Sequence, residues 1–235
     1  MRRVPPELLR RIAAGEASTL TIPDLYFHSN PLIRRLFWAR LERICAFCAD
    51  EPAGAVLDLG CGGGELLPAL AERFRTVVGL DLRPGLAAGL LRHYGLLNEV
   101  YERSGLASAA SKNVHLVCGD LLRPPLRPAS FDVVIAADVL EHLPDLAAAL
   151  AGIRAVLRPG GALIISAPTE NLLYRLGRLC FGFTKPADHY HSARQVEAAS
   201  LRAGFQLARR SYLPWGPFEA FSAFVVVKLR GPGEL

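Results

Sequence analysis

A glycine-rich stretch, VLDLGCGGGELL, carries the clearest chemical signal in the sequence. Glycine-rich turns between a strand and a helix usually hold a nucleotide. The dinucleotide fingerprint G-x-G-x-x-G/A fails here: counted from Gly60 its last position is Glu65, and counted from Gly62 it is Leu67. Asp58 directly precedes the loop, a poor place for a negative charge beside a pyrophosphate. The loop therefore suits a nucleotide-like ligand that carries a cationic amine.

Alternating strands and helices must position this loop. Short apolar runs without polar alternation predict parallel strands covered on both faces. These runs lie at 55–59, 76–80, 114–118, 131–136 and 161–166. Helical stretches lie between them at 65–74, 84–94 and 145–156. The order is typical of an α/β doubly wound, Rossmann-like sheet.

The end of the chain departs from this alternation. Two strands are predicted at 205–213 and 223–230, and the connection between them is too short for a crossover helix. They should form an antiparallel hairpin, which gives seven predicted strands in all.

Two further segments lie outside the alternation. A helix is predicted at 30–49, because Asn30 can cap it and Pro31 suits a first turn. The connection at about 168–192 is long enough to be a lid or a binding loop, and a helix at about 193–203 follows it. We therefore expect an N-terminal helical segment (1–52) that covers the active site, and a main domain at 53–235.

The motifs together resemble the class I S-adenosylmethionine-dependent methyltransferases. The glycine loop is similar to the first motif of that family, and four later segments match in order: VVGLDLRPG, VHLVCGDLLRPPL, FDVVIAADVLEHLPD and LRPGGALIISAPT. The family's seven-stranded sheet also ends in an antiparallel hairpin. The resemblance covers about residues 53–230 and is closest to the branch that methylates small molecules, lipids and quinones.

The resemblance implies S-adenosylmethionine as cofactor and S-adenosylhomocysteine as product. Asp58 would orient the loop and the methionine ammonium, and Asp81, 21 residues after Gly60, would accept both ribose hydroxyls. Asp120 and the Leu121 amide would read the adenine. The remaining expected cofactor contacts are Gly60, Cys61, Gly62, Gly64, Leu82, Ala137 and Val139.

Three histidines are candidates for catalysis. His142 follows the fourth strand of the motif series, near the mouth of the cofactor pocket. His189 and His191 lie in the long connection, where related enzymes often have a histidine that contacts substrate. Methyl transfer from a sulfonium needs mainly alignment, and a base only where the acceptor must lose a proton.

A metal site is a further alternative. Asp138, Glu141 and His142 resemble the acidic-histidine cluster with which quinone O-methyltransferases can bind a divalent metal. Here the first acid is Asp rather than Glu, and its reach is shorter. We therefore predict a polar rim of the pocket and assign no metal ligand.

The acceptor is expected to be small or lipid-like, with methylation at oxygen. Apolar residues mixed with arginine in 32–40 and 172–183 suit an amphiphilic acceptor, or docking on an anionic membrane surface. The net charge of +5 permits acidic partners, but the motif of base-amine methyltransferases is missing after the fourth strand, so nucleic acid is not expected. RNA or protein methylation, and a cofactor-binding partner without turnover, stay as alternatives. Without an apolar leader at the N-terminus, the expected location is the cytoplasm, with peripheral membrane contact as a further option. Acceptor identity and oligomeric state stay open.

Overall fold

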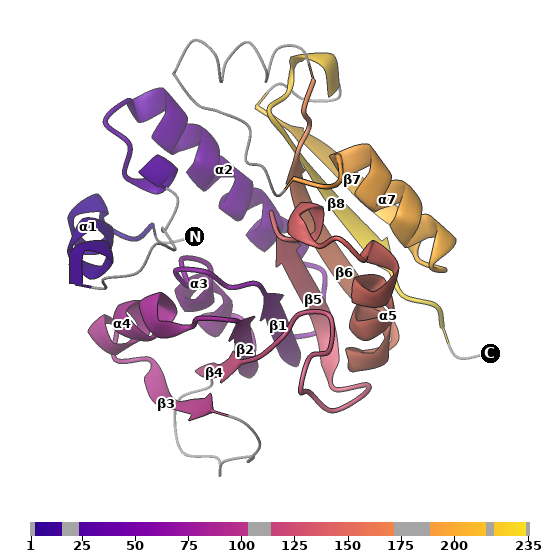
Figure 1. The fold of residues 1–235 in the computed structure, drawn as a ribbon, viewed down its shortest axis with the longest axis horizontal. Helices are drawn as coiled ribbons and strands as arrows, with labels where there is room; N and C mark the ends of the chain where they lie inside the picture. The colour runs from indigo at the N-terminus through magenta and orange to yellow at the C-terminus, as the bar shows by residue number, and fades with distance from the viewer. Residues whose placement is uncertain (1–2, 16–23, 103–113, 172–188, 215–218, 234–235) are drawn as a thin grey trace.

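The computed structural model describes residues 3–15, 24–102, 114–171, 189–214 and 219–233 (Figure 1). The helices are α1 (Pro6–Gly15), α2 (Pro31–Phe47), α3 (Leu67–Ala71), α4 (Gly85–His93), α5 (Leu146–Val156) and α7 (Ala193–Arg202). Short 3-10 turns are η1 (Asp24–Tyr26), η2 (Leu140–His142) and η3 (Glu219–Phe221). The strands are β1 (Ala55–Leu59), β2 (Thr76–Asp81), β3 (Leu97–Glu102), β4 (Val114–Cys118), β5 (Phe131–Ala137), β6 (Leu157–Pro168), β7 (Gln206–Leu213) and β8 (Phe224–Arg230).

Within these residues the strands form one sheet, in the order β3-β4-β2-β1-β5-β6-β8-β7. All seven predicted strands are present, and the pairs β6–β8 and β7–β8 are antiparallel, which confirms the terminal hairpin. The sequence analysis did not predict β3. It adds an eighth, parallel strand beside β4 at one edge of the sheet.

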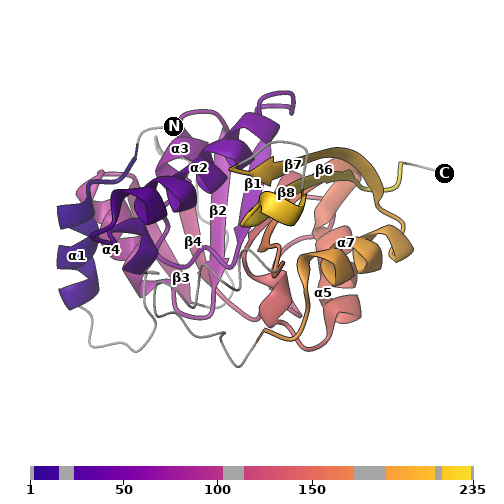
Figure 2. The same cartoon turned by 90° about the horizontal axis from the view of Figure 1, so that it is seen from above.

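Helices cover both faces of the sheet (Figure 2). Alternate residues of each buried strand face opposite ways, so Val56 joins the core on the side of α1 to α4, whereas Leu57 joins the core on the side of α5 and α7. Burial on both faces explains why these strands read as unbroken apolar runs. The sheet thereby holds the carboxyl ends of β1, β2, β4 and β5 in fixed register at one edge.

Local capping sets where α2 and α7 begin. The Asn30 side chain accepts a hydrogen bond of 2.9 Å from the Leu32 amide, and Pro31 occupies the first position of α2, as predicted. Ser192 and Gln195 form a reciprocal capping box at the start of α7. This cap fixes the backbone immediately after His189 and His191.

Buried ion pairs fasten the end of α2 to the terminal hairpin. The carboxylate of Glu51 is almost fully buried and accepts hydrogen bonds of 2.7 and 2.8 Å from the Arg230 guanidinium. It also pairs with Lys228, whose Nζ donates to the Phe47 carbonyl at 2.9 Å. These contacts hold α2 over the sheet, and α2 in turn contributes a side chain to the site.

None of the helices within the described residues combines the length and the apolar composition that a bilayer crossing requires.

Candidate active site

The glycine loop follows β1 and turns back against the end of β2. Gly60, Gly62 and Gly64 have φ angles of +75°, +51° and +79°, in the region that favours glycine. The amides of Gly60 and Cys61 donate to the Leu80 carbonyl at 2.8 and 3.1 Å. A Cβ atom at Gly64 would lie 2.9 Å from that of Ala87, so the loop packs closely on α4.

The loop is tied to the acid at the end of β2. Asp81 accepts one hydrogen bond from the Gly62 amide and another from the Arg83 amide, both at 2.9 Å, each through a different carboxylate oxygen. A carboxylate offers about four lone-pair positions. Both oxygens of Asp81 therefore keep acceptor capacity for a ligand with two neighbouring hydroxyl groups.

Other predicted cofactor residues meet the loop from β4 and β5. A Cβ at Gly60 would lie 2.6 Å from Cγ2 of Val139 and 3.6 Å from Cδ1 of Leu121, so three separate loops converge here. Leu121 is buried, whereas Asp120 is exposed and accepts a hydrogen bond of 2.9 Å from the Leu122 amide. Leu82, next to Asp81, is 62% exposed, so it can cover a flat ring.

Two buried acids lie at the two ends of the loop. Asp58 and Glu65 are 3% and 7% exposed. Burial is the main reason that the pKa of each carboxyl rises to about 7, and repulsion by Glu65 and Asp81 contributes to the rise at Asp58. Oε1 of Glu65 has no hydrogen-bond partner within the described residues. The sequence analysis did not identify Glu65 as a site residue. The one feature that could have indicated it is its position directly after the last glycine of the loop.

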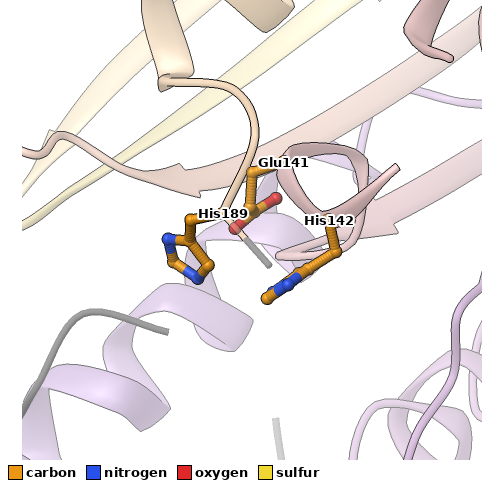
Figure 3. Close-up of side chains that lie close together, drawn as sticks. All are labelled: Glu141, His142 and His189. Carbon is orange, nitrogen blue, oxygen red and sulfur yellow. The ribbon is translucent and has the colours of Figure 1, made fainter. Parts of the chain in front are cut away.

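Three further side chains lie close together beyond the carboxyl end of β5. Glu141, His142 and His189 place one ligand atom each within 4.8 Å of one another, and Figure 3 shows their side chains pointing toward a common space. The rings of His142 and His189 are 4.5 Å apart and nearly perpendicular. The Glu141 carbonyl accepts hydrogen bonds from the amides of Tyr190 (2.9 Å) and His191 (3.3 Å), which bring the segment before α7 onto η2.

His191 does not belong to this cluster, although its Nε2 is buried without a hydrogen-bond partner in the described part of the chain. The residues 172–188, which include most of the expected lid, lie outside the described residues. The partly buried Ala137 ends β5 directly before Asp138 and the cluster.

Asp138 takes a different role from the one that the quinone O-methyltransferase pattern suggested. One carboxylate oxygen accepts from Ser166 Oγ at 2.8 Å, and the other pairs with Arg40 of α2. Arg40 is buried against the rings of Tyr26, Phe37 and Phe224 and also bonds to the Tyr26 hydroxyl. The set Asp138, Glu141 and His142 is therefore not assembled, and His189 stands with Glu141 and His142 instead.

Comparison with known proteins identifies the family of the chain. Residues 57–165 match the family described as "Methyltransferase domain". The chain is 33% identical over 191 residues to a ubiquinone biosynthesis O-methyltransferase of Xanthomonas campestris pv. campestris, with 75% of this chain and 73% of that relative covered. The chain belongs to the class I S-adenosylmethionine-dependent methyltransferases.

Two further similarities concern a curated relative and a solved structure. It is 31% identical over 136 residues to a malonyl-[acyl-carrier protein] O-methyltransferase of Serratia marcescens, covering 58% of this chain and 47% of the relative. The chain thus spans about half the length of several curated relatives that it matches. The N-methyltransferase NodS from Bradyrhizobium japonicum, solved with S-adenosyl-L-homocysteine, has the same fold, with a TM-score of 0.63 at 17% identity over 96% of this chain and 98% of that one.

The pKa values of Asp58 and Glu65 give this methyltransferase an expected pH response. The pKa of each group in the folded chain is higher than the pKa of a free carboxyl, which is near 4. The two protonated acids therefore stabilise the folded chain at low pH, and this stabilisation is lost as pH rises through about 7. A bound ammonium reverses the preference by stabilising the ionised acids. We expect S-adenosylhomocysteine to bind about tenfold more tightly at pH 7.5 than at pH 5.5.

Calorimetry across this pH range, in buffers of different ionisation enthalpy, measures both the affinity and the protons released. The neighbouring charges are Asp81 beside Asp58 and Arg40 beside Glu65. The double variant Asp58→Asn, Glu65→Gln should bind with little dependence on pH. An equally flat profile in the unchanged protein contradicts the assignment of these acids to the ammonium.

Proposed function

We propose that this chain transfers a methyl group from S-adenosylmethionine to an oxygen atom of a small-molecule or lipid-like acceptor. The observation that carries the proposal is the position of the Glu141, His142 and His189 cluster. It lies at the carboxyl edge of the sheet, two residues after Val139, and Val139 itself contacts the glycine loop. Groups that can handle the proton of a hydroxyl thus stand next to the cofactor loop.

The proposed cofactor site uses the converging loops. The carboxylate of Asp81 accepts the two ribose hydroxyls, Asp58 and Glu65 face the methionine ammonium, and Asp120 with the Leu121 amide reads the adenine. Gly60, Cys61, Gly62 and Gly64 bring backbone close to the ligand, while Leu82, Ala137 and Val139 line it. When bound, S-adenosylmethionine supplies an electrophilic methyl group on a sulfonium.

The chain's remaining task is to align the acceptor and to manage its proton. Alignment of two reactants can supply about 7–11 kcal/mol. The acceptor oxygen must lose a proton as it gains the methyl group, and we assign the receipt of that proton to His142 or His189. A hydroxyl acceptor makes better use of these groups than an amine that is already neutral.

The acceptor class follows from the relatives and from α2. The two curated sequence relatives named above are O-methyltransferases, with ubiquinone biosynthesis or malonyl-[acyl-carrier protein] in their names. On α2, Leu32 is 73% exposed beside Arg34 and the exposed Arg35, a composition that suits an amphiphilic acceptor held under an N-terminal cover.

A panel of acceptors with labelled methyl donor tests the function. It should hold catechols and hydroquinones with and without an alkyl chain, simple carboxylic acids, an amine and a mixed RNA. We expect label on a hydroxylated compound and none on the amine or the RNA. Transfer to RNA that weakens steeply with salt would replace the proposal by RNA methylation. Cofactor binding without transfer to any member would favour a non-catalytic partner.

A further inference from the structure

We propose that Glu141, His142 and His189 bind one divalent ion of the zinc type through one carboxylate oxygen and two imidazole nitrogens. The inference rests on the proposed function, because the ion would lie where the acceptor oxygen is expected. It changes one role in that proposal: with the ion bound, His142 and His189 are ligands, and neither imidazole serves as the proton acceptor. It differs from the pattern of the related quinone enzymes in its third ligand, which comes from the segment before α7 instead of from the end of β5.

The geometry suits an ion of this size. The three ligand atoms lie within 4.8 Å of one another. Zinc ligands at about 2.0–2.2 Å from the ion stand roughly 3.4 Å apart in a tetrahedral site, so the side chains would have to close by about 1 Å. Three protein ligands leave a fourth position open, as in catalytic zinc sites.

The burial of Glu141 is evidence for the ion that does not depend on the distances within the cluster. Its side chain is 1% exposed, and neither carboxylate oxygen has a hydrogen-bond partner within the described residues. A buried carboxylate without compensation is costly, and a cation beside it removes that cost.

His189 has the surroundings of a ligating imidazole. Its Nδ1 is 3.4 Å from Oε1 of Glu170, and both side chains are largely buried. Metal-binding histidines usually direct the nitrogen that does not bind the ion toward a carboxylate or a carbonyl, which fixes the ring. In the proposed site Glu170 is the carboxylate that orients the His189 ring in this way.

The donor set decides the class of ion. Asp138 is held by Ser166 and Arg40, and Glu170 lies against His189, so Glu141 is the carboxylate within the cluster of three. Two nitrogens and one oxygen favour Zn²⁺ or Co²⁺, whereas Mg²⁺ prefers an all-oxygen shell with several waters. The structure therefore separates this site from one that contains both Asp138 and Glu141.

Binding of Co²⁺ and Mg²⁺ to the full chain, without affinity tag and after treatment with chelator, tests the inference. We expect one Co²⁺ per chain with visible absorption bands, displacement by Zn²⁺, and no comparable Mg²⁺ binding. Glu141→Gln and His189→Ala should each weaken Co²⁺ binding by more than about 100-fold, since loss of mere supporting groups already costs about 10–100-fold. His191→Ala and Asp138→Asn should bind as the unchanged protein does.

Three results overturn the inference. They are the lack of stoichiometric Co²⁺ binding, equal Co²⁺ binding by His189→Ala, and a loss in Asp138→Asn as large as that in Glu141→Gln. Thermal unfolding of each variant separates lost ligation from misfolding. The failure of the metal site is distinguishable from that of the proposed function: labelled-methyl transfer by metal-free protein leaves the function intact, whereas Co²⁺ binding without affinity for S-adenosylhomocysteine leaves only the metal site.

Discussion

The Asp81→Ala variant is expected to bind S-adenosylhomocysteine at least about 100-fold more weakly than the unchanged protein. Hydrogen bonds to a charged group contribute about 1.5–3 kcal/mol each, and the carboxylate is expected to accept two from the ribose. It also accepts the Gly62 amide at 2.9 Å, so its loss would release the glycine loop as well. Calorimetry with the full chain measures the change.

The control for this experiment is Asp145→Ala. Asp145 caps α5 by accepting from the Ala148 amide at 2.9 Å, far along the chain from the loop. Its loss should cost about 1 kcal/mol of stability and leave the affinity unchanged. If Asp81→Ala binds S-adenosylhomocysteine as tightly as the unchanged protein, the ribose assignment is wrong.

Local signals explain why so much of the fold was predictable. The caps at Asn30 and Ser192 and the unbroken apolar strands depend on neighbouring residues, which a sequence displays directly. The strand β3 lacked such a signal: LNEVYE is half polar, and it pairs at one edge of the sheet. Its formation depends on pairing with the exposed edge of β4, which its own sequence does not display.

The candidate site also has a part that the sequence predicted and a part that it did not. The glycine loop and Asp81 follow directly from motif and spacing. The pairing of Arg40 with Asp138 joins residues 98 positions apart. From the sequence, a basic residue on an amphipathic helix is expected to be exposed at the surface, so the pair could not be predicted. Likewise, nothing local distinguishes His189 from His191; only the fold brings the first beside His142 and leaves the second outside the cluster.

Methyl transfer should fall about 10²–10⁴-fold in His189→Ala, while the affinity for S-adenosylhomocysteine stays within about threefold. The range is that of a lost acid–base group, and loss of a metal ligand would act in the same direction. His189 lies beside His142 and Glu170, and in the proposed site it belongs to the acceptor side and not to the glycine loop. Single-turnover transfer to the best acceptor of the panel measures the rate, and calorimetry measures the affinity.

His191→Ala is the matched control, because it removes an imidazole two positions away on the same segment. The main-chain bonds from Tyr190 and His191 to the Glu141 carbonyl do not depend on the side chain, so the segment should stay in place. Its transfer rate should remain within about threefold of the unchanged protein. Should the two variants lose activity equally, the segment acts as a structural cover; if His189→Ala transfers at the normal rate, the cluster plays no part in chemistry, and the acceptor must be sought elsewhere along the carboxyl edge of the sheet.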